Sequence, residues 1–348
     1  MSISTIYRLA SQGDSPALEA LIAATADAGL IGFTDEYQAD LLELHRALAD
    51  DLHSVVAERD GCVVGMAFAD VHPVQVCGEV RVGAYLSHLR VASEHQRQGI
   101  ARALSDWGLD YLSDRFGPEI VPYAAIMQGN LSLRLAARYG FQTTEPIQGG
   151  VVPVRRRPPM PQPELEVRLA HQADLPAIAD GMNRYYCEHN LWSPVSAASL
   201  EAFLEQDAAG VKPNQLYVVA RGGEPLAGLS TSDRTALVHM RITRAPWFLR
   251  LLGAWLGVLP RSGVLRALTV RRLWFEAGEL DSARYLWQSL RYRLRSQADG
   301  LGIAYDLRDR LADVFRLPAW LPTFPARYVV RVEGKLETGR LTYCIAGP

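Results

Sequence analysis

The sequence predicts an α/β protein made of two consecutive domains, each with a mixed β-sheet covered by helices. Three observations support this prediction. A strand, a polar turn and an amphipathic helix follow one another between Tyr85 and Leu112. A stretch rich in arginine and proline, residues 155–163, interrupts the helical and strand patterns. After this stretch the order of predicted elements starts again, which is typical of an internal repeat.

The composition is that of an ordinary globular protein. Of the 348 residues, 49% are hydrophobic and 21% are charged, and the formal net charge is −2. This charge indicates no general affinity for nucleic acid or for an anionic membrane. The N-terminus has no basic region followed by an apolar run, which argues against a secretory signal. The four cysteines are scattered and form no CxxC pair, so we expect a reduced cytoplasmic protein without a metal site.

The first domain, residues 1–152, is predicted from strand and helix patterns taken in order. Ser15 and Pro16 begin its first helix, because proline is favoured in a first helical turn. Asp60 and Gly61 form a hairpin turn between two strands. Strands are expected at 3–9, 53–58, 63–70, 85–91, 121–127 and 150–156, and helices at 15–28, 34–49, 99–112 and 131–138.

The central strand of this domain begins at Tyr85. Strict alternation places Ser87, Leu89 and Val91 on the same face as Tyr85, and His88 on the opposite face. A lone histidine in a strand is more often a core residue than a functional one. Residues on the face of Tyr85 are therefore the first candidates for a site.

The turn after this strand, Gln96–Ala101, has the properties of an anion-binding site. The first amide groups of a helix lack partners and lie at the positive end of the helix dipole. Gly99 removes a Cβ where a phosphate oxygen must approach the backbone, and Ala101 is small and favours helix. Arg97 and Arg102 add positive charge around the turn.

This stretch resembles the GNAT family of N-acetyltransferases, whose signature Gln/Arg-x-x-Gly-x-Gly/Ala follows a strand and opens a helix. The match falls at Gln96, Gly99 and Ala101. The resemblance implies central strands that splay apart between 85–91 and 121–127. It also implies acetyl-CoA as co-substrate, with its pyrophosphate on the loop and its pantetheine arm along the strand. The expected cofactor-binding residues are Leu89, Val91, Gln96, Arg97, Gln98, Gly99, Ile100, Ala101, Arg102, Asn130 and Ser132.

The resemblance also points to residues for the chemistry. Transfer to an amine needs a base for the proton of the amine and an acid for the leaving thiolate. In GNAT enzymes the acid is frequently a tyrosine four residues before a Gly-Phe pair, a position held here by Ala136. Tyr139 is the replacement candidate, and Tyr85 and Ser87 are candidates for holding a water or taking the proton. Weaker candidates are Asp35, Glu36, Tyr37, Glu79, His88 and Tyr123.

Residues 153–164 are predicted to be an inter-domain linker, because prolines stiffen the chain and remove hydrogen-bond donors. The second domain, residues 165–348, repeats the order of elements with little identity. Strands are expected at 165–170, 216–220, 226–230, 266–274, 303–307 and 327–332, and helices from 174, at 282–296 and at 311–316.

The second domain departs from the first where phosphates would bind. Glu276, Glu279 and Asp281 occupy the corresponding turn, and like charges repel. We therefore expect a degenerate copy without an acetyl-CoA site. An insertion at 244–262, rich in Trp and Leu, is expected to be either a core helix or a wall over the acceptor site.

The sequence thus predicts an N-acetyltransferase that moves an acetyl group from acetyl-CoA to a primary amine by direct transfer in a ternary complex. The acceptor is expected to be a small molecule or a peptide. No nucleic acid, membrane or metal is expected, and a homodimer is left open. The alternative is a non-catalytic acyl-CoA-binding regulator or interaction protein with the same fold, which the missing tyrosine at Ala136 permits.

Overall fold

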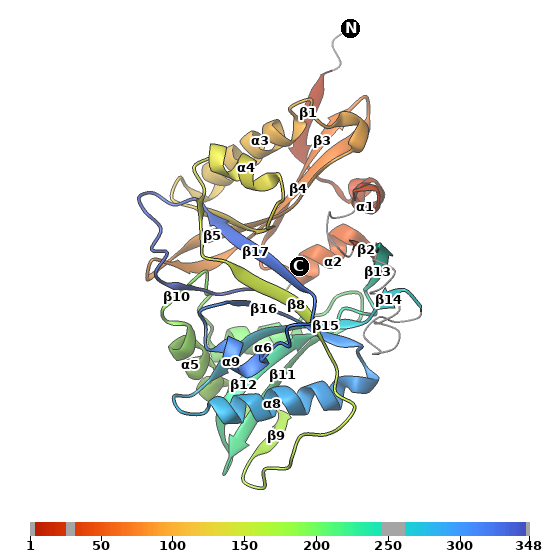
Figure 1. Ribbon diagram of the computed structural model, residues 1–348. Helices are drawn as coiled ribbons and strands as arrows, with labels where there is room; N and C mark the ends of the chain where they lie inside the picture. Colours follow the sequence, from red (N-terminus) through yellow and green to blue (C-terminus); the bar gives the residue numbers. More distant parts are fainter. Residues whose placement is uncertain (1–3, 26–31, 245–261, 346–348) are drawn as a thin grey trace.

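The computed structural model describes residues 4–25, 32–244 and 262–345. We call β1–β8 the N-terminal half and β9–β18 the C-terminal half. Figure 1 shows the two halves one above the other, with the strands of one sheet running through both. The insertion expected at 244–262 lies almost wholly outside the described residues.

The N-terminal half follows most of the predicted order. Its elements are β1 (Thr5–Leu9), α1 (Ser15–Ala24), β2 (Gly32–Tyr37), α2 (Leu41–Leu48), β3 (Leu52–Arg59), β4 (Cys62–Val76), β5 (Glu79–Val91), α3 (Ile100–Phe116), β6 (Val121–Met127), α4 (Ser132–Arg138), β7 (Gln142–Thr143) and β8 (Ile147–Pro153). The strand expected at 121–127 has the predicted bounds. The strands β4 and β5 are longer than expected because they form one continuous hairpin.

The C-terminal half repeats this order after a segment, 154–165, that contains no helix or strand. Its elements are β9 (Glu166–Leu169), α5 (Leu175–Tyr186), β10 (His189–Asn190), α6 (Ala197–Glu205), β11 (Asn214–Arg221), β12 (Glu224–Ser232), β13 (Val238–Arg244), β14 (Val264–Leu265), β15 (Ala267–Phe275), α8 (Leu280–Arg293), β16 (Gly300–Asp306), α9 (Leu311–Phe315), β17 (Thr323–Val330) and β18 (Leu341–Thr342). The division into domains at 153–164 stays a prediction.

Thirteen strands of the described residues form one mixed sheet. Twelve of them follow the path β1-β3-β4-β5-β6-β17-β8-β16-β15-β12-β11-β9, and β7 pairs with β17 beside it. The path has the same pattern from either end, because the parallel pairs β5–β6 and β15–β16 occupy equivalent places between antiparallel neighbours. The internal repeat expected from the sequence is therefore visible in the topology of the sheet.

The two halves exchange strands at the centre of the sheet. Residues 326–330 of β17 pair with residues 123–127 of β6, and all of β8 pairs with β16. The two exchanged strands also pair with each other. The strand expected at 150–156 is therefore shifted to Ile147–Pro153, and it completes the sheet of the other half. Each half therefore needs one strand from the other half to complete its part of the sheet.

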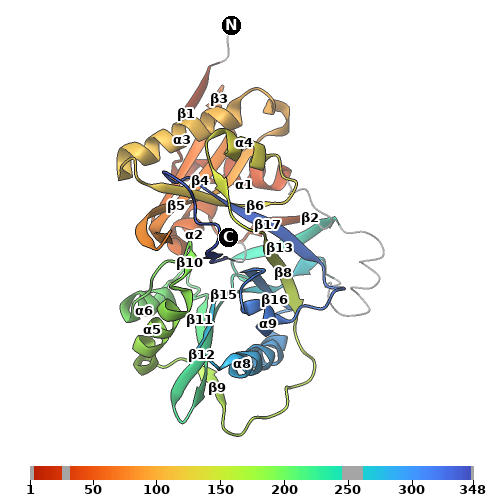
Figure 2. The ribbon, with the colours of Figure 1, turned by 60° about the vertical axis from the view of Figure 1, so that its left-hand side comes forward.

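Helices cover both faces of the sheet in each half (Figures 1 and 2). In the N-terminal half, α1 and α2 pack on Met66 and Phe68, whereas α3 packs on the opposite face around Val55 and Leu104. In the C-terminal half, α5 and α6 cover one face and α8 and α9 the other. None of the helices in the described ranges is long and apolar enough to cross a membrane.

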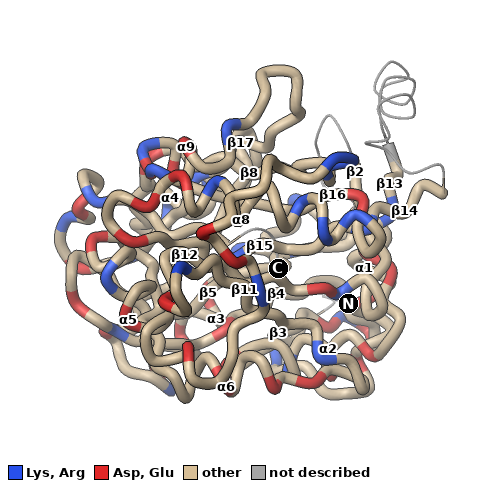
Figure 3. Tube along the Cα trace, turned by 90° about the horizontal axis from the view of Figure 1, so that it is seen from below, with Lys and Arg blue, Asp and Glu red and all other residues tan. Residues whose placement is uncertain are grey.

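Charged residues of both signs are interspersed along the chain (Figure 3), and one ion pair is repeated in both halves. Arg8 at the end of β1 binds Asp14 at 2.7 Å, and Arg168 at the end of β9 binds Asp174. In both halves the arginine holds the pKa of the carboxyl group below its usual value, to about 2 for Asp14. The internal repeat is therefore visible in this ion pair as well as in the order of elements.

The helix expected at 34–49 is wrong in its first part. Residues Gly32–Tyr37 form β2, which pairs antiparallel with β13 of the C-terminal half. The helix α2 begins only after Asp40, whose carboxylate accepts from the backbone N–H of Glu43 at 3.0 Å. This capping contact starts the helix. The pairing partner of β2 is 200 residues away by number, so local periodicity does not reveal the strand.

We predict opposite effects for two helical glycines. A Cβ on Gly181 in α5 would lie 2.3 Å from Trp274, so Gly181→Ala should lower the free energy of unfolding by roughly 1–3 kcal/mol through overpacking. A Cβ on Gly108 in α3 would lie 3.7 Å from Val55, so Gly108→Ala should raise it by roughly 0.5–1 kcal/mol. Urea denaturation of the full chain measures both. Equal effects of the same sign would contradict this packing.

Candidate active site between the splayed strands

The strands β5 and β6 pair over three residues only, in the middle of β5 and at the beginning of β6. Residues 83–85 pair with residues 121–123 in parallel, and beyond them the two strands line a cavity of about 700 Å³. On their outer edges β5 remains paired with β4 and β6 with β17. The inner-edge backbone groups of 86–91 and 124–127 therefore have no strand partner and face the cavity. The splay expected from the sequence is confirmed.

A β-bulge in β5 decides which side chains face the cavity. His88 has φ of 54°, and the register with β4 shifts at this point. A bulge inserts one extra residue, so alternation is displaced beyond it. Leu89 and Val91 consequently pack against α3, away from Tyr85. The expected common face of Tyr85, Leu89 and Val91 is wrong, and His88 packs against Phe68 on the side of α2.

Two half-buried histidines lie beside the gap. The rings of His88 and His45 are in edge contact with centroids 5.1 Å apart. Burial lowers the pKa of His45 to about 4 and that of His88 to about 3, so both rings are neutral near pH 7. The Oγ atom of Ser87 lies 3.0 Å from Nδ1 of His88, and the hydroxyl of Tyr37 lies 3.3 Å from Nε2 of His45. Nε2 of His88 has no hydrogen-bond partner in the described part of the chain.

The loop before α3 has the geometry that an anion requires. Gly99 is the N-cap with φ of 84°, and no side chain caps the helix. A Cβ on Gly99 would meet nothing within 4 Å, which leaves room for a ligand atom. Gln96 donates to the carbonyl of Val91 at 3.1 Å, and Gln98 accepts from Arg59 at 2.6 Å. These bonds hold the loop while its first helical amides remain available.

The other residues expected to bind acetyl-CoA lie around this loop and across the gap. Arg97 and Arg102 are exposed beside the loop, whereas the side chain of Ile100 is buried, so only its backbone can meet a ligand. The Oδ1 atom of Asn130 accepts from the backbone N–H of Ser132 at 2.9 Å. Both residues line the cavity opposite β5. Leu89, Asn130 and Ser132 thus line the cavity, whereas the loop residues 96–102 are not part of its lining. The roles of all these residues stay predictions.

Tyr139 is held against α3. Its hydroxyl lies 2.6 Å from the carboxylate of Asp106 and 3.0 Å from the carbonyl of Arg102. Burial and the bond to Asp106 raise its pKa to about 12. A phenol with this pKa gives up its proton less readily than ordinary tyrosine. Tyr139 lines the cavity together with Ala136, and its role as the acid stays a prediction.

Tyr85 belongs to an aromatic cluster at the point where the strands part. Its ring lies 5.4 Å from that of Tyr123, and the hydroxyl of Tyr123 lies 2.6 Å from Nε2 of His72. Burial raises the pKa of Tyr85, which disfavours the phenolate that a base would require. The structure therefore brings together Ser87 and His88 at the gap, whereas Tyr85 packs where the gap begins.

Comparison with known proteins agrees with this geometry. Residues 18–141 match the model of the acetyltransferase (GNAT) family. Residues 18–141 are a GNAT domain. No curated protein sequence is similar enough to the chain to give a match.

Solved structures extend the likeness to the whole chain. A GCN5-related N-acetyltransferase from Anabaena variabilis has a TM-score of 0.53 and 14% identity, covering 94% of this chain and 73% of that one. A GCN5-related N-acetyltransferase from Kribbella flavida has a TM-score of 0.56 and 13% identity, covering 95% of this chain and 71% of that one. N-myristoyltransferase from Saccharomyces cerevisiae with bound myristoyl-CoA has a TM-score of 0.65 and 10% identity, covering 95% of this chain and 83% of that one. At these identities the likeness shows the fold alone, and it confirms the expected fold class.

The C-terminal half differs from the GNAT domain at the turn before α8. Gly278 has φ of 88°, close to that of Gly99. Glu276 pairs with Arg184 at 2.6 Å, and Glu279 pairs with Arg221 at 2.9 Å. Acidic groups with their own cations thus surround the helix start, and the expectation that this half binds no acetyl-CoA stays a prediction.

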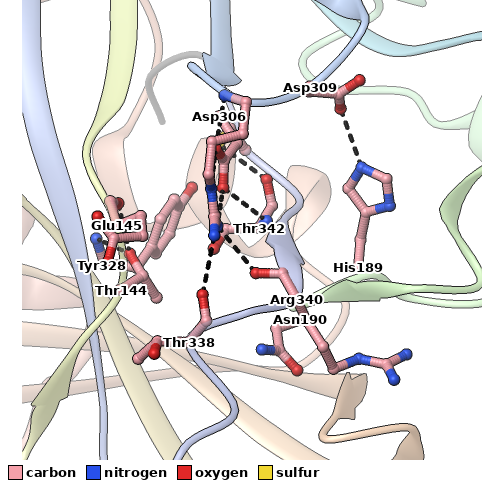
Figure 4. Close-up of polar contacts among 12 residues, drawn as sticks. Thr144, Glu145, His189, Asn190, Asp306, Asp309, Tyr328, Thr338, Arg340 and Thr342 are labelled. Atoms are coloured by element: carbon pink, nitrogen blue, oxygen red, sulfur yellow. Dashed lines mark hydrogen bonds and ion pairs between the residues drawn. The ribbon is translucent and has the colours of Figure 1, made fainter.

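The gap between β15 and β16 is filled by the last residues of the described chain (Figure 4). The backbone N–H of Thr342 donates to Asp306 at 3.1 Å, and His189 binds Asp309 at 2.9 Å. Tyr343 and neighbouring residues leave a cavity of only about 10 Å³ there. The two equivalent gaps therefore differ: one is open, and the other is occupied by protein.

The sequence analysis did not identify the walls that the C-terminal half contributes to the open cavity. They include Arg234, Val238, Met240, Leu265 and Phe324, which come from the turn before β13, the β13–β14 pair and β17. Residues of β15 and β16 also line the cavity. The strands β13 and β17 reach the GNAT domain through pairing with β2 and β6. The segment between β12 and β15 is longer than its counterpart in the N-terminal half, and this extra length was the signal in the sequence that could have indicated these walls. In the described ranges, no cluster of His, Cys, Asp and Glu is arranged to hold a metal ion.

We predict that the two cavity histidines reduce stability in acid. Their folded pKa values of about 4 and about 3 lie below the ordinary histidine value of 6.5. As pH falls below 6.5 the unfolded chain takes up protons that the folded chain does not. The free energy of unfolding should therefore fall by up to about 1.4 kcal/mol per pH unit for each histidine.

Chemical denaturation between pH 7 and pH 4 measures this slope. His45→Gln/His88→Gln should flatten it, because neither variant side chain titrates. His171→Gln serves as the matched control, since His171 is exposed. A double variant that keeps the slope of the wild type would show that these rings are not buried in the neutral form.

Proposed function

We propose that the protein is an N-acetyltransferase that moves an acetyl group from acetyl-CoA to a primary amine, by direct transfer in a ternary complex. The observation that carries the proposal is the gap between β5 and β6, which lines a cavity and lies on the strand that leads to the uncapped start of α3. The match of residues 18–141 to the GNAT family supports it.

The chain can hold acetyl-CoA along one path. Helical amides after Gly99 face the pyrophosphate, and Arg97 and Arg102 add charge beside it. The inner edge of β5 offers backbone hydrogen bonds to the pantetheine arm, because no strand pairs with it. When bound, acetyl-CoA supplies an activated acetyl thioester at the gap.

His88 is proposed to take the proton of the amine, because it lines the cavity and its ring is neutral near pH 7. Nδ1 of His88 lies 3.0 Å from Oγ of Ser87, and in the tautomer with its proton on Nδ1 the lone pair of Nε2 is available to accept a proton. Burial makes this ring a weaker base than an ordinary histidine. The amine nitrogen forms the new C–N bond as the C–S bond breaks, and its proton passes to Nε2. The proton then goes to the leaving thiolate through water. Unpaired N–H groups of β5 stabilise the carbonyl oxygen during the step.

We predict that Gly99→Ala weakens acetyl-CoA binding by at least roughly tenfold, because the methyl group occupies the approach of a phosphate oxygen. Gly223→Ala is the matched control. Gly223 has φ of 93° and open space around its Cβ, as Gly99 has, so it suffers the same kind of backbone strain in the β11–β12 hairpin of the C-terminal half. Calorimetric titration of the full-length variants measures the difference.

The stoichiometry of the same titration tests the two halves. One site per chain, weakened only by Gly99→Ala, is the expected result. Two sites per chain would contradict the assignment of a single site to the N-terminal half. An absence of binding to the wild-type protein would overturn the proposed function.

We predict that His88→Gln lowers kcat by roughly 100-fold or more while the KM for acetyl-CoA is unchanged, since general-base catalysis contributes at this scale. Ser87→Ala should cause a smaller loss, because it only orients the ring. Steady-state acetylation of an amine panel measures both. Full activity of His88→Gln would remove it from the mechanism.

A regulator that binds acyl-CoA without turnover is the second candidate. The observation that favours it is the absence of a free acid: Ala136 holds the usual tyrosine position, and the hydroxyl of Tyr139 is engaged by Asp106. Binding of acetyl-CoA without transfer to any amine of the panel would favour this candidate.

A donor with a longer acyl chain is favoured by one branch of the cavity. This branch runs beneath α3, where Gly108, Ala67 and Ala69 leave room between two hydrophobic clusters. The yeast structure of similar fold holds myristoyl-CoA. Titration with acyl-CoA of increasing chain length, in parallel with acetyl-CoA, distinguishes the donors.

A further inference from the structure

The guanidinium group of one cavity residue makes no hydrogen bond or ion pair within the described part of the chain. This residue, Arg234, is half-buried on the side of α2, and its Nε atom is buried without a hydrogen bond. Burial lowers its pKa to about 9, with a further decrease from Arg271 that the charges of Tyr37 and Asp35 oppose. Taking a charge out of water without a hydrogen-bonded partner costs free energy, so the side chain is expected to serve a ligand.

The backbone holds this arginine in a fixed place. Its carbonyl accepts from the N–H groups of Leu237 at 2.9 Å and Val238 at 2.8 Å. Asp233 accepts from the backbone and hydroxyl of Thr235, which closes the turn before β13. Leu237 is buried against Leu44 of α2. A rigid turn thus presents an unpaired guanidinium to the chamber, and little order is lost when a ligand binds.

The charges around the chamber favour an anion. Among described residues that line it, the charged groups are Arg90, Arg234 and Asp35, which leaves a net charge of +1 while His45 and His88 are neutral. Asp35 and Arg90 have interactions of their own. Arg234 is the cation that remains available.

We propose that the acceptor is an amine that also carries a carboxylate, which Arg234 binds. This inference rests on the proposed function and names its substrate class. The planar guanidinium fork matches a carboxylate through two parallel hydrogen bonds. The remaining walls are apolar, with Phe33 and Phe324 in edge contact at 6.2 Å and Leu48, Val238 and Leu265 nearby. An apolar amino acid fits this combination.

A bound carboxylate also affects His45. The charge of Arg234 is among the causes that lower the pKa of His45, and an anion on Arg234 offsets this charge. The pKa of His45, whose ring contacts His88, therefore rises when the acceptor is bound.

The first experiment measures binding without turnover. The probe is 3-phenylpropanoate, which has the apolar part and the carboxylate but no amine, titrated calorimetrically into the full-length protein. Arg234→Met should weaken its binding by roughly tenfold or more, and Arg234→Lys by less. Arg241→Met is the control, because Arg241 is exposed on β13 and paired with Glu36. No binding to the wild-type protein, or equal binding to Arg234→Met, would overturn the proposal.

The second experiment measures transfer from acetyl-CoA. L-Phenylalanine should be preferred to 2-phenylethylamine by roughly tenfold or more in kcat/KM, and Arg234→Met should abolish the preference mainly through KM. O-Phosphoethanolamine against ethanolamine distinguishes a phosphate from a carboxylate, and a preference for phosphate would overturn the carboxylate assignment. If the probe binds through Arg234 but no amine is acetylated, the anion site stands and the proposed function fails.

A stability measurement separates a binding role from a structural one. Replacing an unpaired, half-buried cation with an apolar side chain removes a desolvation cost. Arg234→Met should therefore unfold at a temperature equal to or above that of the wild-type protein. A lower unfolding temperature would show that Arg234 supports the fold, and would overturn the inference.

Discussion

The separation of β5 from β6 after Tyr85 is the constraint on which the rest of the structure depends. Backbone groups at a strand edge must find partners, and a sheet normally supplies them from the next strand. Here the outer edges are satisfied by β4 and β17, while the inner edges open onto the cavity. The bulge at His88 accompanies the separation and turns one polar ring toward the same space. The candidate site is the gap between these two strands, and it is bounded by β4 of the N-terminal half and β17 of the C-terminal half.

The two halves contribute unequally to this site. The N-terminal half supplies the helix start at Gly99 and the open gap, whereas the C-terminal half supplies β17 and the wall that carries Arg234. In the C-terminal half the equivalent gap is closed by residues 341–344 and the equivalent helix start is surrounded by paired acids. The two halves repeat the same order of elements, but only one open site results, and each half supplies a different part of it.

Local sequence patterns predict structural features that depend on nearby residues. They do not predict features that depend on residues far away in the sequence. The strand at 121–127 and the glycine at the start of α3 were predictable, because hydrophobic periodicity and helix-start chemistry are local. The reversal of faces at His88 was not, since a bulge adds one residue without a sequence signal. β2 and the walls around Arg234 were missed because their partners lie in the other half of the chain.

The exchanged strands have a consequence for how the chain folds as it is synthesised. When the ribosome has made the whole N-terminal half, β6 still presents an open edge, because β17 is encoded nearly 200 residues later. Open edges favour pairing with other chains, so the nascent protein carries this liability until β17 has emerged. The wall that β17 gives to the cavity and the strand that covers β6 are therefore completed in the same step.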